Sequence, residues 1–315
     1  MTSSTERATM AEAPCPGAEM STPLQRILAA TDFSPQAWQA LERAARLAKT
    51  HGAELALLHA FEHVPLIPAW GDPGGGAWVD EEALLDSTRA HLERVRDNLT
   101  ETYGIPIKAS VEVGAVHRQI NARADGFGAD LVVIAASGAS GLARRLFGSS
   151  AQSIVRTARH PVLVVRRPAD SDYRRIMIGT DFSEDAERAA NFALRLAPDA
   201  AVSLSHSLEQ STVRIPAPLG LEDNEREAHL ARARTIAAQG LAELADRLGR
   251  GQAETRVFDG HASQNLVEWA ATWNADLIAI GAHGKSRLEA GLIGSTSLHA
   301  ISDAGCDVLV TPRIE

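Results

Sequence analysis

The sequence of 315 residues predicts an α/β protein made of two tandem, doubly wound, Rossmann-like domains, each with a five-stranded parallel sheet. Three observations predict this fold. The length suits two domains of about 150 residues each. A set of short motifs occurs twice in the same order. Within each copy, short runs that are apolar throughout alternate with helical patterns, which is typical of strands covered on both faces of a parallel sheet.

The repeat is clearest in the motif Thr-Asp-Phe-Ser, which occupies 31–34 and recurs at 180–183. Four further pairs follow at a similar offset: Leu58-His59 with Ser205-His206, 130–134 with 276–280, Gly148-Ser149 with Gly294-Ser295, and 162–165 with 308–311. A nearly constant offset indicates duplication of one unit. The polar stretch 167–172 contains a proline and predicts the boundary. We therefore expect three parts: a flexible tail over 1–21, an N-terminal domain over 22–167 and a C-terminal domain over 172–315.

In the first unit, strands and helices are expected to alternate from the start. A buried strand at 27–30 precedes a helix that begins with Ser34 as N-cap and Pro35 in its first turn, and Gly52 ends that helix. The later elements are expected, in order, as a strand at 55–58, a Pro/Gly-rich loop at 64–76, a helix at 80–103, a strand at 107–113, a helix at 118–126, a strand at 131–134, a helix at 150–157 and a strand at 162–165. Right-handed crossovers give a doubly wound sheet. Such sheets bind ligands beyond the carboxyl ends of the strands, at the switch in strand order, so the loops after the first and fourth strands are candidate sites.

Composition limits the classes of partner. The formal net charge of −9 argues against nucleic acid and acidic membranes, which attract basic surfaces, but it allows a small anion held by backbone N–H groups. The two cysteines, Cys15 and Cys306, fit a reducing compartment. No apolar run reaches the ~20 residues that span a bilayer, and 1–21 has no apolar segment of a secretory signal. A cytoplasmic location is expected.

Glycines follow the fourth strand of the second unit in two clusters. Gly-Ala-His-Gly at 281–284 is followed, after nine residues, by Gly-Ser-Thr at 294–296, where a helix is expected to begin. Glycine lets a backbone approach a ligand and adopt positive φ. Exposed N–H groups at a helix start, beside small hydroxyl side chains, can hold phosphate. The spacing therefore predicts a phosphate site.

The pattern Gly-x2-Gly-x9-Gly-Ser resembles the ATP-binding signature of the universal stress protein family, as do Thr-Asp-Phe-Ser and the Leu-His that ends the second strand. The resemblance covers about 22–315 and implies a tandem two-domain member. It implies that the Asp and the backbone after the His hold adenosine, while the glycines and hydroxyl residues hold ribose and phosphates. The implied C-terminal site is Asp181, Ser207, Ile280, Gly281, Gly284, Gly294, Ser295 and Thr296. The implied N-terminal site is Asp32, Ala60, Gly138, Gly148, Ser149 and Ser150.

The two implied sites are not equivalent. Ala135 replaces the first glycine of the N-terminal loop, and a left-handed backbone there would penalise its methyl group. We therefore expect tighter binding in the C-terminal half, although Arg144 and Arg145 could recover phosphate affinity in the other. We also expect the last strands of the two units to pair, because each is an apolar sheet edge that needs a partner.

Several of the residues in these motifs also fit purely structural roles. Asp32 and Asp181 could simply anchor the first helix of each unit, and His59 and His206 are expected to be packed residues rather than ligands. Lys285 follows Gly284 as in a P-loop, but Ala279 stands where that motif needs a glycine. No zinc-ligand spacing is found around His59. Trp269 and Trp273 lie one helical turn apart and are expected in a core or interface.

Three functional hypotheses remain. The first is a stress-response sensor or regulator that binds ATP, with or without magnesium, or another adenine nucleotide. The second is a slow ATPase or autokinase with Ser295 or Thr296 as acceptor. The third is a structural paralogue without nucleotide. No general base, arginine finger or metal-binding carboxylate pair is evident, so a binding protein is favoured over an enzyme. The expected ligand is an adenine nucleotide. The expected assembly is a pseudo-dimer within one chain, with a homodimer as a further option.

Overall fold

The computed structural model describes residues 23–62, 81–138, 148–209, 223–284 and 294–313. The expected tail, the loop at 64–76, Cys15, Arg144, Arg145 and Lys285 lie outside these residues. The first unit consists of β1 (Arg26–Thr31), α1 (Pro35–His51), β2 (Glu54–Phe61), α2 (Glu81–Tyr103), β3 (Ile107–Val113), α3 (Val116–Phe127), β4 (Leu131–Ala135), α4 (Ser149–Thr157) and β5 (Val162–Val165). The second consists of β6 (Arg175–Gly179), α5 (Glu184–Leu196), β7 (Ala201–Leu208), α6 (Asp223–Arg247), β8 (Glu254–Asp259), α7 (Ala262–Thr272), β9 (Leu277–Gly281), α8 (Ser295–Asp303) and β10 (Asp307–Thr311).

The first helix begins and ends as its residues predict. Ser34 Oγ accepts from Ala37 N–H at 3.1 Å, and Gly52 closes α1 in the left-handed conformation with φ 66°. These contacts satisfy N–H and C=O groups that a helix end leaves unpaired. By contrast, α3 begins at Val116, two residues before the predicted start. Its cap is Ala115, which makes no side-chain hydrogen bond, so the sequence carries no capping signal there.

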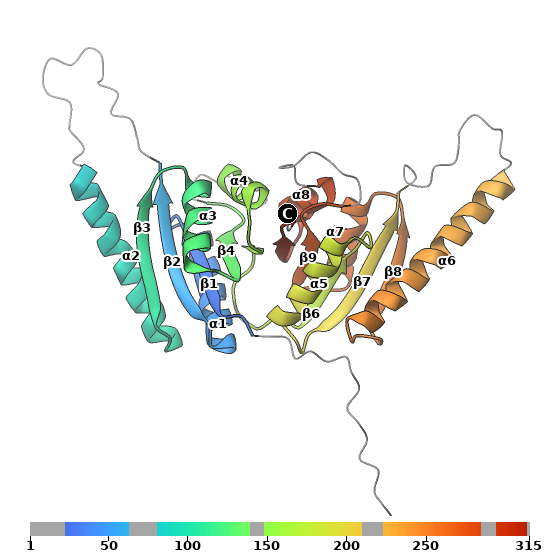
Figure 1. The fold of residues 1–315 in the computed structure, drawn as a ribbon, viewed down its shortest axis with the longest axis horizontal. Helices are drawn as coiled ribbons and strands as arrows, with labels where there is room; N and C mark the ends of the chain where they lie inside the picture. The colour runs from blue at the N-terminus through green and yellow to red at the C-terminus, as the bar shows by residue number, and fades with distance from the viewer. Residues whose placement is uncertain (1–22, 63–80, 139–147, 210–222, 285–293, 314–315) are drawn as a thin grey trace, which may run out of the picture.

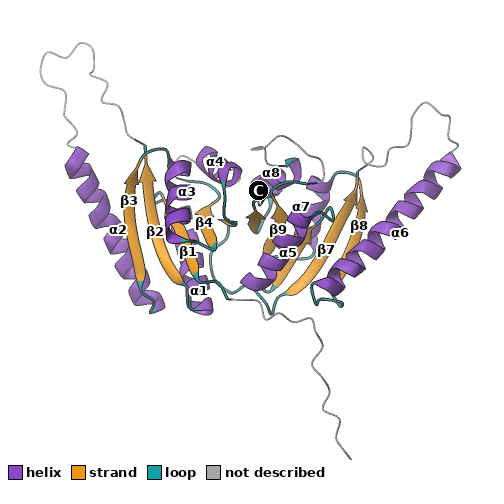
Figure 2. Ribbon diagram, in the orientation of Figure 1, coloured by secondary structure: helices purple, strands orange, loops and turns teal. Residues whose placement is uncertain are grey.

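The strands form one continuous sheet in the order β3-β2-β1-β4-β5-β10-β9-β6-β7-β8. All neighbours within a unit are parallel, as predicted for a doubly wound fold, and β5 pairs with β10 antiparallel, with Leu163 opposite Leu309. The predicted pairing of the two last strands is thus confirmed. Each strand of a sheet is rotated by about 20–25° relative to its neighbour. Between β2 and β7 these rotations add up, and they nearly cancel the change of strand direction at the antiparallel junction of β5 with β10, here called the seam. The arrowheads of β2 and β7 consequently point the same way in Figures 1 and 2.

Helices cover both faces of the sheet, and each face has its own core. Along β1, Ile27 and Ala29 face a core that also contains α1, α2, α5 and α6, while Leu28 faces a core with α3, α4, α7 and α8. Both cores continue across the seam, because Leu163 and Leu309 join the first and Val164 joins the second. Strands buried on both faces explain the uninterrupted apolar runs of the sequence. In the described part of the chain, no helix is both long and apolar enough to cross a membrane.

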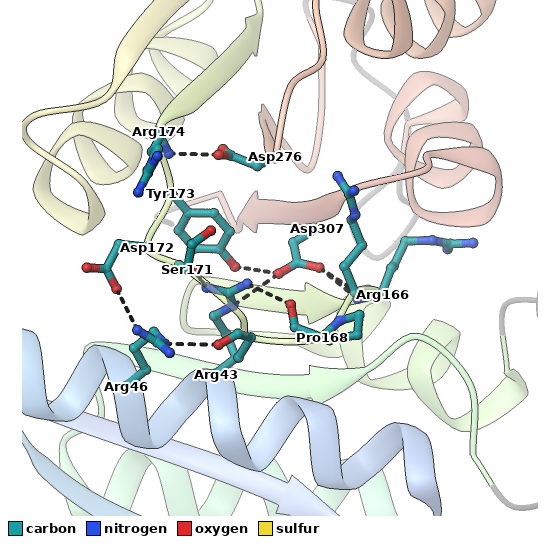
Figure 3. Close-up of polar contacts among 12 residues, drawn as sticks. Arg43, Arg46, Arg166, Pro168, Ser171, Asp172, Tyr173, Arg174, Asp276 and Asp307 are labelled. Atoms are coloured by element: carbon teal, nitrogen blue, oxygen red, sulfur yellow. Dashed lines mark hydrogen bonds and ion pairs between the residues drawn. The ribbon is translucent and has the colours of Figure 1, made fainter. Parts of the chain in front are cut away.

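A buried carboxylate lies where the linker passes between the units (Figure 3). Asp307, at the start of β10, accepts from Arg166 N–H at 2.8 Å, from Arg167 N–H at 3.2 Å and from the Tyr173 hydroxyl at 2.6 Å. Arg43 of α1 places Nε 3.4 Å from Oδ2, and the two side chains are 6% and 1% exposed. Burial raises the pKa of Asp307, and Arg43 and the surrounding donors oppose that shift.

The linker is also tied to α1 through its carbonyl groups. Arg43 donates to Ser171 O at 2.7 Å and lies 4.4 Å from the ring centroid of Tyr173. One turn later, Arg46 Nε donates to Ala169 O at 3.0 Å. Residues of the second unit and of the linker thus meet a helix of the first unit around one carboxylate.

Replacing Asp307 should destabilise the whole chain. Asp307→Asn leaves the buried guanidinium of Arg43 without its counter-charge, which should lower the free energy of unfolding by about 3–5 kcal/mol. Asp172→Asn is the matched control, because that carboxylate is 65% exposed and lies 3.7 Å from Arg46, where ion pairs contribute little. Equilibrium urea unfolding compares the variants. Equally small losses would show that the buried pair does not hold the units.

Candidate functional site

A cavity of about 140 Å³ lies in the first unit, beyond the carboxyl ends of β1 and β4. This is the position that a doubly wound sheet offers to ligands. The structure brings all the N-terminal site residues predicted from the sequence to this cavity: Asp32, Ala60, Gly138, Gly148, Ser149 and Ser150. They come from the ends of β1 and β2, from the loop after β4 and from the first turn of α4.

Apolar and small residues outside the implied site form the rest of the wall. They are Ala30, Thr31, Ala37, Val116, Ile120, Ile134, Ala135, Ser137, Ala151 and Ile154. Val116 and Ile120 are one turn apart on α3. Such spacing is found on any helix that covers a sheet, so it carries no signal of a site. The cavity therefore combines an apolar base with polar groups from the glycine loop and α4.

The first-strand motif holds its own backbone. Thr31 Oγ1 accepts from Phe33 N–H at 3.0 Å, and Asp32 Oδ1 accepts from Ser34 N–H at 3.0 Å. These bonds fix a turn in which Phe33 has φ 62°, which is rare for a bulky residue. The second unit repeats this geometry, with Phe182 at φ 61°. Anchoring of the helix by the aspartate, which the sequence left as an alternative, is therefore observed.

The strand-two histidines complete the same arrangement. His59 Nδ1 lies 2.8 Å from Thr31 O, and its ring stacks on Phe33 at 4.4 Å between centroids. In the second unit, His206 Nδ1 lies 2.8 Å from Thr180 O. Both are packed residues, as expected. Burial lowers the pKa of His59, and its hydrogen bond to Thr31 opposes that shift. Among the described residues, no cluster of His, Cys, Asp or Glu could hold a metal ion.

The loop glycines are positions of close backbone approach rather than of left-handed turns. None of Gly138, Gly148, Gly281, Gly284 and Gly294 has positive φ, so the expected left-handed conformation is wrong. A Cβ on Gly138 would lie 2.2 Å from Asp32 Oδ2, and one on Gly284 would lie 3.0 Å from Asp181 Oδ2. Each of these two glycines lets the loop after the fourth strand contact the carboxylate of the first-strand motif.

Gly281 lies close to the backbone of α5 and does not form a left-handed turn. A Cβ there would lie 3.0 Å from Asp185 C and 3.2 Å from Ala186 N, in the backbone of α5. The first unit accommodates Ala135 at the corresponding position, as part of the cavity wall. The reason given for weaker N-terminal binding, a left-handed penalty on this alanine, is therefore removed.

The remaining predicted residues of the second unit lie at the equivalent strand ends. Ile280 is buried in β9, and Ser207 on β7 accepts from Asn265 Nδ2 at 3.2 Å. Gly294 N–H donates to Ala282 O at 2.9 Å, and Ser295 and Thr296 form the first turn of α8.

Other side chains singled out by the sequence have structural surroundings. Trp269 Nε1 donates to Ser203 Oγ at 3.1 Å, and Trp273 Nε1 donates to Glu254 at 2.9 Å, so both are packing residues as expected. Cys306 is buried, and burial raises its pKa to about 12. A thiol with that pKa is a poor nucleophile at neutral pH.

Comparisons with known proteins agree with this architecture. A model described as the universal stress protein family matches residues 23–166 and 172–312. A universal stress protein of Mycolicibacterium smegmatis is 28% identical over 296 residues, covering 91% of this chain and 97% of that protein. Universal stress protein MJ0531 of Methanocaldococcus jannaschii is 30% identical over 145 residues, covering 46% and 83%. The crystal structure of a universal stress protein from Archaeoglobus fulgidus matches with a TM-score of 0.62 at 20% identity, covering 94% and 100%.

Strand order and site geometry define a tandem, doubly wound α/β protein, in which a Thr-Asp-Phe-Ser turn faces a glycine loop in each unit. The family model covers both units. The chain therefore belongs to the universal stress protein family.

An alanine at Gly281 should harm the fold. Gly281→Ala forces the start of α5 to move, and overpacking of this kind costs about 1–3 kcal/mol. Gly305→Ala is the control, because a Cβ there meets no atom within 4 Å. Urea unfolding should show a loss for Gly281→Ala and little change for Gly305→Ala. Equal stability of both variants would contradict the assigned contact with α5.

Titration of His59 should couple stability to pH. Its folded-state pKa is lowered, so the unfolded chain binds a proton first, and stability is lost as pH falls below the unfolded value of about 6.5. His59→Asn removes the titrating ring and keeps a side-chain N–H. The variant should show a shallower decline in unfolding free energy from about pH 7 to about pH 5. A slope equal to that of the unsubstituted chain would refute the assignment.

Proposed function

We propose that the chain binds an adenine nucleotide, ATP in the first instance, and acts as a nucleotide-dependent regulator rather than as an enzyme. The observation that carries this proposal is the cavity of the first unit. It gathers Asp32, Ala60, Gly138, Gly148, Ser149 and Ser150 at the carboxyl ends of the strands.

The chemistry of the cavity suits a nucleotide. Its base is lined by Val116, Ile120 and Ile134, and apolar side chains of this kind favour a flat, weakly polar ring such as adenine. Its other side is the start of α4, where Gly148 is the N-cap and makes no side-chain hydrogen bond to the first turn. N–H groups at such a helix start attract phosphate oxygens.

A second site is proposed in the C-terminal unit. It consists of Asp181, Ser207, Ile280, Gly281, Gly284, Gly294, Ser295 and Thr296, with ATP bound with or without magnesium. Support comes from the repeated turn at Phe182 and from the approach of Gly284 to Asp181, which matches that of Gly138 to Asp32. With the left-handed penalty on Ala135 removed, the two sites are proposed as similar in kind.

Nucleotide binding is favoured over turnover because the polar side chains near the cavity already hydrogen-bond to the backbone. Asp32 and Asp181 each accept a backbone N–H through one oxygen, and His59 bonds to Thr31 O. A general base must be able to reach the attacking group, and these side chains are engaged in holding the turn.

Blocking either glycine loop should remove one nucleotide per chain. Isothermal titration of the full chain, freed of bound nucleotide, should give two ATP per chain. Gly138→Val and Gly284→Val should each give one, because the added side chain must displace the adjoining carboxylate or the ligand. Overpacking of about 1–3 kcal/mol corresponds to a loss of roughly 5- to 150-fold in affinity.

Gly126→Val in α3 is the control, since a Cβ there meets no atom within 4 Å. It should keep both sites. Absence of ATP binding by the unsubstituted chain, or an unchanged stoichiometry in both loop variants, would overturn the proposal.

A further inference from the structure

Arg166 of the first unit caps a helix of the second. Its guanidinium donates to Ile301 O and, at 2.9 Å, to Ser302 O. These are carbonyl groups of the last turn of α8, which a helix leaves without an internal partner. A cation at this end also favours the helix dipole. The helix whose first turn carries Ser295 and Thr296 is thus held at its other end by the neighbouring unit.

Among the residues that the structure describes, the first unit shows no equivalent of this contact. The last carbonyl of α4, Thr157 O, accepts from Asn121 Nδ2 at 2.9 Å, within its own unit. The residue after β10 that corresponds to Arg166 is Pro312, which has neither a backbone N–H nor a polar side chain. In the described part of the chain, the helix-capping contact therefore runs from the N-terminal unit to the C-terminal unit.

Backbone hydrogen bonds connect the residue before Arg166 to the loop that lines the N-terminal cavity. Val165 O accepts from Ala136 N–H at 3.0 Å, and Ala136 O accepts from Gly148 N–H at 3.0 Å. Gly148 lines the cavity and precedes α4. The N–H of Arg166 itself is fixed by Asp307. One residue thus connects the glycine loop of the first site, the buried carboxylate and the end of α8.

The first turn of α8 is also held by a hydrogen bond, so the Arg166 contact at the last turn can affect it. The helix has nine residues, and Ser297 Oγ in its first turn donates to Gly281 O at 2.8 Å. A short helix bonded at both ends moves as a unit, so a shift at Ser302 reaches the turn that carries Ser295.

We propose that Arg166 is a positioning residue for the C-terminal nucleotide site. Through this residue, nucleotide binding at the N-terminal site changes the position or mobility of α8. This inference rests on the proposed function. Phosphate at the start of α8 and the guanidinium at its end both complement the helix dipole, so fixing the guanidinium in place favours binding at the other end. The contact itself is asymmetric, because α4 is capped within its own unit, so loss of the Arg166 side chain should weaken the C-terminal site, while any coupling between the two filled sites is reciprocal.

The first test measures each site of the full chain separately. Gly138→Val leaves the C-terminal site to be titrated with ATP, and Gly284→Val leaves the N-terminal one. Adding Arg166→Met should weaken the C-terminal site about five-fold, at the low end of couplings between sites, and leave the N-terminal site within about two-fold. Arg167→Met is the matched control, because Arg167 is exposed and contributes its backbone N–H to Asp307.

The second test leaves Arg166 unchanged. In the Gly284→Val chain, ATP can fill only the N-terminal site, and it should slow amide hydrogen exchange over 298–303, in the last turns of α8. Arg166→Met in that background should abolish the slowing. If ATP binds but neither effect is seen, the coupling is overturned and nucleotide binding stands. If the unsubstituted chain binds no ATP, both proposals fall.

Discussion

The buried carboxylate of Asp307 sets the arrangement on which the rest of the molecule depends. It starts the strand that forms the seam, and it collects donors from the linker and from α1. The pseudo-symmetric positions show that the fold of a single unit does not need this cluster. The residues that correspond to Asp307, Arg43 and Tyr173 are Pro161, Phe192 and Leu24. Apolar residues therefore occupy the corresponding positions. The polar residues of the cluster are better explained by the single path that the linker must take, because buried ion pairs seldom add stability.

Antiparallel pairing of β5 with β10 gives the seam a second property. It joins two apolar edges that would otherwise be exposed, and the continuous cores on both faces follow from it. Accumulated strand twist then turns the outer strands of the two units to point the same way (Figure 1). The residues just after β5 are carried to the end of α8, where Arg166 bonds. The contact between Arg166 and the last turn of α8 is therefore a consequence of sheet geometry.

Much of the fold could be predicted from the sequence because it depends on local patterns. Apolar runs such as 131–134 identify buried strands, and Ser34 with Pro35 identifies the start of α1. The positive φ of Phe33 could not be predicted, since it arises from hydrogen bonds within the turn and runs against the steric preference of the residue. The Arg43–Asp307 pair joins residues far apart in the chain, and no spacing rule brings them together. The positive φ expected for the loop glycines was wrong, because only the structure shows which atoms approach them.

The close approach of Gly138 to Asp32 joins the parts of the candidate site. If Gly138 had served a left-handed turn, its role would end with the loop, and Asp32 would be a separate ligand. Instead the loop lies directly against the Asp32 carboxylate, while the other oxygen of that carboxylate holds the start of α1. Strand end, first helix and glycine loop are therefore one connected structure. A negatively charged chain can present such a site to an anion because the groups that would face phosphate are backbone N–H groups at the start of a helix, whose attraction does not depend on net charge. Selectivity would then come from the shape of the apolar base and from where the aspartate holds the loop.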